Sequence, residues 1–243
     1  LPRSKRMAGG AAEEQPTAWT STSYRQTWEW IRDTALGMQQ LGIGAGDRVC
    51  ILSRTRPAWL VADLASISLG AVTCPIYPSS EANQAAFIIN NVGAKLVFVE
   101  NAQQAAKIES IRAECPTIET IVVFDERGRL PEGTVGFDHI FDLAATDPDN
   151  RRLWEEEWRG LTRDDLATII HTSGTTANPK GAMLTHGNLV FNYEAVIQVV
   201  DFYPEDVFLS WLPLSHIYER VAGMVVPLGR GCAIAYAEPL IER

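Results

Sequence analysis

Residues Leu166–Leu189 read LATIIHTSGTTANPKGAMLTHGNL, and the interpretation of the whole chain starts from this stretch. The β-branched run 167–172 gives way to residues rich in Gly, Ser, Thr and Pro, and the short apolar run 182–184 follows. Runs of this kind, separated by turn residues, predict a strand, an exposed loop and a second strand.

The predicted loop carries groups that suit phosphate. Hydroxyls donate hydrogen bonds, glycines let the backbone approach a ligand closely, and a lysine adds positive charge. These groups are Ser173, Gly174, Thr175, Thr176, Lys180 and Gly181. The P-loop of nucleotide triphosphatases does not match, because Pro179-Lys180-Gly181 stands where that motif has Gly-Lys-Ser/Thr. A plain surface turn is the alternative interpretation.

The stretch from His171 to Gly181 resembles the signature of the adenylate-forming superfamily, which includes acyl-CoA synthetases, peptide-synthetase adenylation domains and luciferases. There the loop reads Ser/Thr-Gly-Thr-Thr-Gly-x-Pro-Lys-Gly, and Ala177 is the one departure, since the family usually has Gly. A methyl group at Ala177 requires a negative φ or strains the loop. The resemblance implies that the ATP phosphates are bound by Thr172, Ser173, Gly174, Thr175, Thr176, Ala177, Lys180 and Gly181.

A second motif follows at Pro213-Leu214-Ser215-His216, with Glu219-Arg220 beyond it. It is similar to the second motif of acyl-CoA synthetases, most of all the long-chain fatty acid branch, where the histidine lies near the reacting carboxylate. The resemblance implies that His216 binds substrate and that His216 and Lys180 are the catalytic pair. A histidine taken alone is more often a structural residue with satisfied hydrogen bonds. Glu219 and Arg220 are also open to a purely structural interpretation.

The resemblance implies an acid–thiol ligase that uses ATP to activate a long-chain fatty acid to the acyl-adenylate and then to acyl-CoA. ATP and CoA are co-substrates, and Mg²⁺ is the implied cofactor. The resemblance implies that Thr172 is the side chain nearest the metal. A threonine at the end of a strand can instead form a hydrogen bond within its own loop. The alternatives are adenylation of an aromatic or amino acid, a non-catalytic nucleotide-binding fragment, and a phosphatase that releases the γ-phosphate.

Several family motifs have no counterpart in the 243 residues: the acidic Mg²⁺ ligand, the ribose-binding Asp, the hinge and the C-terminal lysine. The chain also begins with Leu and ends without an obvious terminal element. We therefore expect the N-terminal fragment of a larger ligase, inactive by itself. Acyl chain length and oligomeric state are not fixed by the sequence.

Composition narrows the classes of partner. The net charge of −9 argues against nucleic acid, whose phosphates require basic surfaces. No apolar run is long enough to span a membrane, although a long-chain substrate would favour peripheral contact with one. Cys50, Cys74, Cys115 and Cys232 are scattered without CxxC pairs, which predicts reduced core thiols in a cytoplasmic protein.

Strand and helix patterns alternate roughly every 25 residues, which predicts an α/β fold with a mostly parallel sheet and helices on both faces. By resemblance, this is the N-terminal part of the large domain of an adenylate-forming ligase. We expect a disordered lead-in over 1–16, a first α/β half over 17–160, and the truncated start of a second over 161–243. A strand is expected to end at Cys74, before Pro75-Ile76-Tyr77-Pro78. Residues 147–160 are expected to form a surface helix docked by Trp154 and Trp158.

Overall fold

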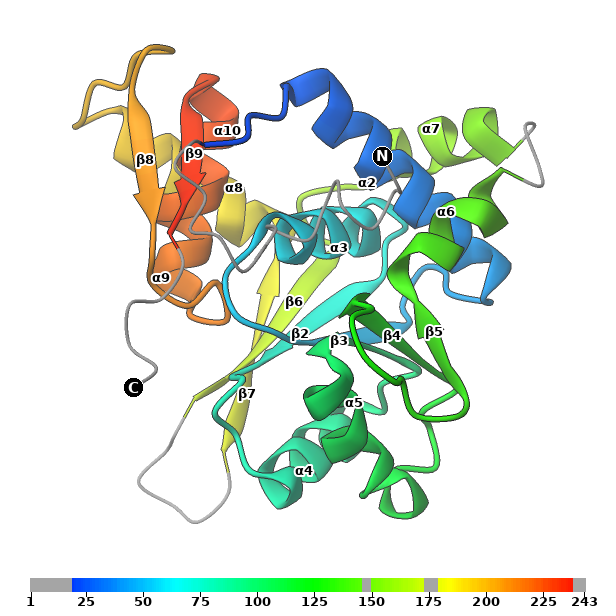
Figure 1. Ribbon diagram of the computed structural model, residues 1–243. Helices are drawn as coiled ribbons and strands as arrows, with labels where there is room; N and C mark the ends of the chain where they lie inside the picture. The colour runs from blue at the N-terminus through cyan, green and yellow to red at the C-terminus, as the bar shows by residue number, and fades with distance from the viewer. Residues whose placement is uncertain (1–18, 146–149, 173–178, 238–243) are drawn as a thin grey trace.

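The computed structural model describes residues 19–145, 150–172 and 179–237, which form the α/β architecture in Figure 1. Its main sheet has seven strands in the order β5-β4-β3-β1-β2-β6-β7. All neighbours run parallel except the β6–β7 hairpin. The strands are β1 (Arg48–Leu52), β2 (Val72–Ile76), β3 (Leu96–Asn101), β4 (Thr120–Asp125), β5 (Thr134–Gly136), β6 (Leu166–Thr172) and β7 (Lys180–Thr185). The predicted fold class is confirmed.

Helices cover both faces of this sheet (Figure 1). One face packs on α2 (Tyr24–Gln40), α3 (Pro57–Ser68), α6 (Phe137–Ala144) and α7 (Asn150–Gly160), and the other on α4 (Ala82–Val92) and α5 (Ala102–Glu109), with the short 3-10 helix η1 (Arg112–Glu114) after α5. A hydrophobic core lies on each face of the sheet, and successive residues of a strand point into the two cores in turn. In β1, Val49 and Ile51 lie in the first core, and Cys50 and Leu52 lie in the second. Burial on both faces is the usual state of a parallel sheet.

Local sequence sets several helix boundaries. The hydroxyl of Ser23 accepts a hydrogen bond from the backbone N–H of Gln26, and the side chain of Gln26 accepts one from the backbone N–H of Ser23, so α2 begins with a capping box. Thr185 and Asn188 form the same motif at α8 (His186–Ile197). Trp154 docks α7 as expected: it is fully buried, and its Nε1 donates to the hydroxyl of Ser68 at 2.9 Å.

The expectation that the second strand ends at Cys74 is wrong. β2 continues through Pro75 and Ile76, which pair with Ile51 and Leu52 of β1. On its other side, the described pairing of β2 with β6 is at Thr73. A proline is tolerated there because the ladder to β6 does not extend along that part of β2.

A smaller two-stranded parallel sheet, β8 (Val207–Ser210) with β9 (Ala233–Tyr236), follows α8. Between its strands run α9 (Ile217–Glu219), the π-helical segment η2 (Arg220–Val225) and α10 (Val226–Arg230). β6 and β7 belong to the main sheet, so the boundary between 160 and 161 stays a prediction. All four cysteines are free and buried, as predicted for core thiols. Within the described ranges, no helix has the length and apolarity needed to cross a bilayer.

A buried ion pair joins the two sheets. Arg220 and Asp63 are both fully buried, and Nε and Nη2 of Arg220 donate to the two carboxylate oxygens at 2.9 and 2.6 Å. Nη2 also donates to the hydroxyl of Thr73 at 2.9 Å. Burial raises the pKa of Asp63, and the adjacent guanidinium opposes that rise. The structural interpretation of Arg220 is thus confirmed: it ties η2 to α3 and β2.

Removing one member of this pair should destabilise the fold severely. Asp63→Ala leaves the Arg220 guanidinium buried without a counter-ion, and we expect the free energy of unfolding to fall by about 3–5 kcal/mol. Urea denaturation followed by circular dichroism measures the change.

The matched control is Arg152→Ala, which breaks the exposed pair of Arg152 with Glu156 on α7 and should cost less than about 1 kcal/mol. The double variant Asp63→Leu with Arg220→Met should be more stable than Asp63→Ala, because no charge is left unpaired. Equal losses for Asp63→Ala and Arg152→Ala would contradict the structural role given to the pair.

Candidate functional site

The β6–β7 hairpin places two of the predicted phosphate ligands side by side. Thr172 at the end of β6 is in register with Lys180 at the start of β7, and both are exposed. Within the described residues, no acidic side chain pairs with Lys180. The charge of Lys180 is therefore available to an anion. The predicted ligands Ser173, Gly174, Thr175, Thr176 and Ala177 lie outside the described residues.

Gly181 has a packing role that the sequence did not reveal. It is in register with His171, and a Cβ built on Gly181 would lie 2.8 Å from Cγ2 of Ile169 and 3.3 Å from Nε2 of His171. Nε2 of His171 donates to Oδ1 of Asn91 on α4 at 3.0 Å. The missing side chain at Gly181 leaves room for this ring, which links the hairpin to α4.

The second motif is attached to the carboxyl ends of β1 and β2. The hydroxyl of Thr55, just after β1, donates to the carbonyl of Leu212 at 2.7 Å and accepts from the N–H of Leu214 at 3.0 Å. The buried hydroxyl of Ser215 donates to the carbonyl of Ile76, the last residue of β2, at 3.3 Å. These three residues of the segment are thereby fixed at the carboxyl edge of the main sheet.

His216 is exposed and caps α9. Its Nδ1 accepts the backbone N–H of Tyr218 at 3.1 Å, so in the neutral ring the proton is on Nε2. Nε2–H is consequently a donor that faces away from the helix end. The exposed ring is therefore able to donate from Nε2 to a carboxylate or phosphate oxygen.

The adjacent Glu219 has a structural environment. Its carboxylate accepts from the hydroxyl of Ser210 at 2.8 Å, and a Cβ on Gly223 would lie 2.3 Å from Oε1 of Glu219. Burial raises the pKa of Glu219, and the bond from Ser210 opposes that rise. Glu219 therefore joins α9 to β8 and lies against Gly223 of η2, in agreement with the structural interpretation.

The two motifs share one edge of the sheet. β2 pairs with β1 on one side and with β6 on the other, all three parallel, so their carboxyl ends lie at the same edge. Ligands of open α/β sheets bind at this edge. Among the described residues, no hydrogen bond or ion pair joins His216 to Thr172 or Lys180. The groups are thus arranged around the edge rather than bonded to one another.

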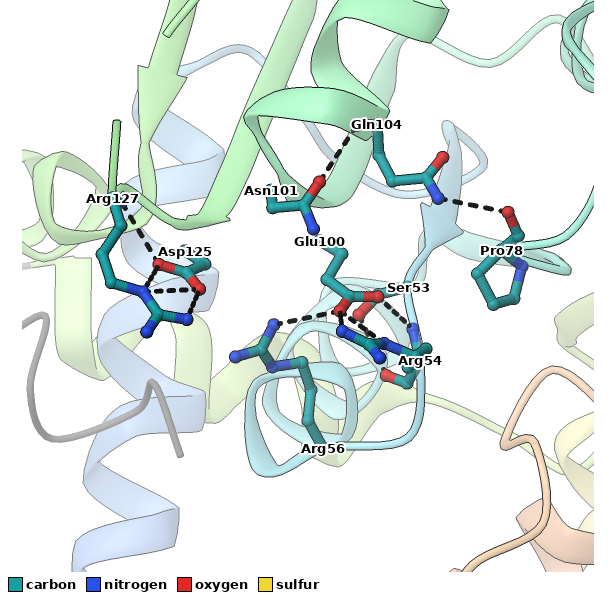
Figure 2. Close-up of polar contacts among 9 residues, drawn as sticks. All are labelled: Ser53, Arg54, Arg56, Pro78, Glu100, Asn101, Gln104, Asp125 and Arg127. Atoms are coloured by element: carbon teal, nitrogen blue, oxygen red, sulfur yellow. Dashed lines mark hydrogen bonds and ion pairs between the residues drawn. The ribbon is translucent and has the colours of Figure 1, made fainter. Parts of the chain in front are cut away.

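A third polar cluster at the same edge was missed at the sequence level (Figure 2). Glu100, buried at the end of β3, accepts from the N–H and Nε of Arg54 at 2.9 and 2.7 Å, and lies 3.9 Å from Nη1 of Arg56. Asp125, near the end of β4, pairs with Arg127, which holds the pKa of Asp125 below its usual range.

The cluster drawn in Figure 2 contains the guanidinium groups of Arg54, Arg56 and Arg127 and the carboxylates of Glu100 and Asp125, whereas the whole chain has a net charge of −9. The cluster therefore places three guanidinium groups at the carboxyl edge near β1, β3 and β4. The observation that could have predicted this cluster is that charged residues directly follow three neighbouring parallel strands.

Comparison with known proteins is consistent with this geometry. Residues 6–243 match the model of the family described as AMP-binding enzyme. Over 216 residues, 85% of the chain, it is 33% identical to the long-chain-fatty-acid–CoA ligase FadD15 of Mycobacterium bovis. Over 80% of the chain it is 34% identical to the peroxisomal long chain acyl-CoA synthetase 7 of Arabidopsis thaliana. The chain spans 34% and 28% of the lengths of these two relatives.

A solved structure shares the fold. The ATP-bound crystal structure of MatB from Rhodopseudomonas palustris superposes with a TM-score of 0.72 at 25% identity, covering 93% of this chain and 42% of that one. The similarity therefore extends over nearly all of this chain but less than half of the solved one.

The packing of His171 predicts a pH dependence of stability. Burial lowers the pKa of His171 below its ordinary value of about 6.5, so the folded protein favours the neutral ring. The ring of His171 therefore binds a proton more readily in the unfolded state than in the folded state. Its contribution to stability is fully present above about pH 6.5 and is lost as the pH falls toward the pKa that His171 has in the folded protein. His171→Gln should remove this loss, and thermal unfolding at pH 7.5 and pH 5.5 measures it.

Between pH 7.5 and pH 5.5, the melting temperature of His171→Gln should fall less than that of the wild type. His186, whose pKa is also lowered by burial, is retained in both proteins and serves as an internal control. A difference that is the same at both pH values would contradict the environment assigned to His171.

Proposed function

Because the chain belongs to the AMP-binding enzyme family of adenylate-forming ligases, we propose that it provides the triphosphate- and acid-binding edge of a long-chain fatty acid–CoA ligase. The observation that supports this most is Lys180, exposed and without an acidic partner among the described residues, in register with Thr172 at the carboxyl edge. The chain spans about a third of its curated relatives, so the activity proposed is that of a protein of their length.

In the proposed reaction, a carboxylate oxygen of the fatty acid attacks the α-phosphorus of ATP, and the bond to the bridging oxygen breaks to release pyrophosphate. A thiol sulfur of CoA then attacks the acyl carbon and displaces AMP. Carboxylate and triphosphate repel each other, so catalysis depends on neutralising and aligning them. Lys180 would bind the β- and γ-phosphate oxygens, and Nε2–H of His216 would donate to the carboxylate or to the α-phosphate.

The residues at the edge fit a Mg²⁺ ion held mostly by the nucleotide. Mg²⁺ usually keeps several waters and binds through one or two protein oxygens together with substrate phosphates. Among the described residues, no group of three His, Cys, Asp or Glu side chains could hold a metal by itself. The exposed hydroxyl of Thr172 beside Lys180 would supply one oxygen ligand. When bound, the ion would neutralise phosphate charge.

Long-chain specificity is proposed from the names of the relatives and from the motif around His216. A cytoplasmic location and peripheral contact with a membrane stay predictions. Adenylation of an aromatic or amino acid is the alternative, and it shares the phosphate-binding edge. The nature of the acid therefore has to be tested separately from nucleotide binding.

Lys180→Ala tests the phosphate-binding role. A charge-assisted hydrogen bond contributes about 1.5–3 kcal/mol, so the affinity for Mg·ATP should fall roughly 10- to 100-fold. Isothermal titration of the chain measures the affinity. In a ligase of the relatives' length that carries the same residues, fatty-acid-dependent ATP–pyrophosphate exchange should fall by at least the same factor.

Lys95→Ala is the matched control, because Lys95 lies at the opposite end of the strands and pairs with Asp47 at 2.8 Å. This variant should bind Mg·ATP as the wild type does. Unchanged affinity in Lys180→Ala would refute the assignment. Mass analysis of the nucleotide products distinguishes the alternative functions. AMP with pyrophosphate indicates adenylation, and ADP with phosphate indicates a phosphatase. Intact ATP indicates a non-catalytic nucleotide-binding fragment.

A further inference from the structure

A groove of about 550 Å³ lies between α2, α3 and α7 on one side and α8 and α10 on the other. The walls are mainly apolar and include Trp28, Leu64, Ile67, Trp158, Val190 and Leu228. The rings of Trp28 and Trp158 meet edge to face at 5.8 Å. A volume of this size falls in the range of small-molecule sites.

The groove is distinct from the candidate site at the carboxyl edge. Its lining includes Leu161–Arg163, which precede β6, and His186, which follows β7. Leu166 and Thr185 are in register at that end of the hairpin, whereas Thr172 and Lys180 are in register at the other. At about 3.3 Å per residue, the length of β6 separates the two ends by roughly 20 Å.

The hydroxyl and guanidinium groups around the groove have partners in the protein, whereas Nε2 of His186 and Nε1 of Trp158 have none among the described residues but are buried from solvent. The hydroxyl of Tyr24 donates to the carbonyl of Cys232, that of Thr27 to the carbonyl of Ser23, and that of Thr162 to Asp165. The hydroxyl of Ser68 accepts from Nε1 of Trp154, and Arg163 pairs with Glu194 at 2.6 Å.

These pairings restrict the chemistry of a ligand. A polar molecule would replace few of the hydrogen bonds to water that it loses, which is costly. An aliphatic chain loses none, and each buried methylene contributes about 0.8 kcal/mol. The walls combine flexible aliphatic side chains with tryptophan rings, which suits a chain that can bend better than it suits a rigid ring system.

We propose that this groove is a second ligand site, which binds a single alkyl chain whose head group remains in solvent. The site does not depend on the function proposed for the carboxyl edge, because it shares no residue with the hairpin ends or with His216. It would allow the protein to hold an aliphatic molecule while the carboxyl edge is free or occupied.

Titration of the chain with a series of 1-alkanols, from 1-hexanol to 1-decanol, tests this proposal through the fluorescence of the groove tryptophans. The dissociation constant should fall about fourfold for each added methylene. Decanoate and 1-decanol should bind within about threefold of each other, since Arg163 is already paired. Saturating Mg·ATP should leave the affinity for 1-decanol unchanged.

Val190→Phe, which fills the groove from α8, should weaken 1-decanol binding at least tenfold, and Thr27→Phe should do so from the opposite wall. The matched control is Val199→Phe, a substitution at a position that is 81% exposed and outside the lining, which should bind like the wild type. Circular dichroism verifies folding of each variant. Affinity independent of chain length, competition by Mg·ATP, much tighter binding of decanoate, or normal binding by both filled variants would overturn the proposal.

Discussion

The arrangement of the two sheets depends on one buried ion pair, between Asp63 of α3 and Arg220 of η2. Two charges without access to water are tolerated only when they are paired and hydrogen-bonded. Thr73 extends the network: its hydroxyl accepts from Arg220, and its carbonyl accepts from the hydroxyl of Thr168 on β6 at 2.7 Å. A single set of bonds therefore connects the apolar helix α3, the central strand β2, the hairpin strand β6 and the segment that carries His216.

This network has a functional consequence because Arg220 lies one helical turn after His216. Fixing Arg220 against β2 fixes the preceding segment over the carboxyl ends of β1 and β2, where Thr55 and Ser215 bind it again. The same strand β2 lies next to β6, which ends at Thr172. The proposed acid-binding and phosphate-binding groups are thus positioned by the core.

Local sequence patterns predicted the parts that depend on neighbouring residues. The strands on either side of the predicted phosphate loop and the docking of Trp154 were both confirmed. Interactions between distant residues were not predictable in this way. Asp63 is one charge in an apolar helix and its partner lies 157 residues away, so only the fold reveals the pair. The arginine cluster around Glu100 likewise requires knowledge of the strand order.

The extension of β2 through Pro75 shows a similar limit, because the tolerance for proline depends on how far the neighbouring strand extends. For the candidate site, Thr172, Lys180 and His216 were proposed from the sequence and stay predictions. The role of Gly181 in accommodating His171 became visible only in the register of the hairpin. The most direct test of the account is hydrogen–deuterium exchange of the chain with and without Mg·ATP. We predict slower exchange in peptides that cover the β6–β7 hairpin and residues 212–218, with no change in β5 and α6. Bound nucleotide that leaves both of those regions unaffected would contradict the assignment of the carboxyl edge as the nucleotide site.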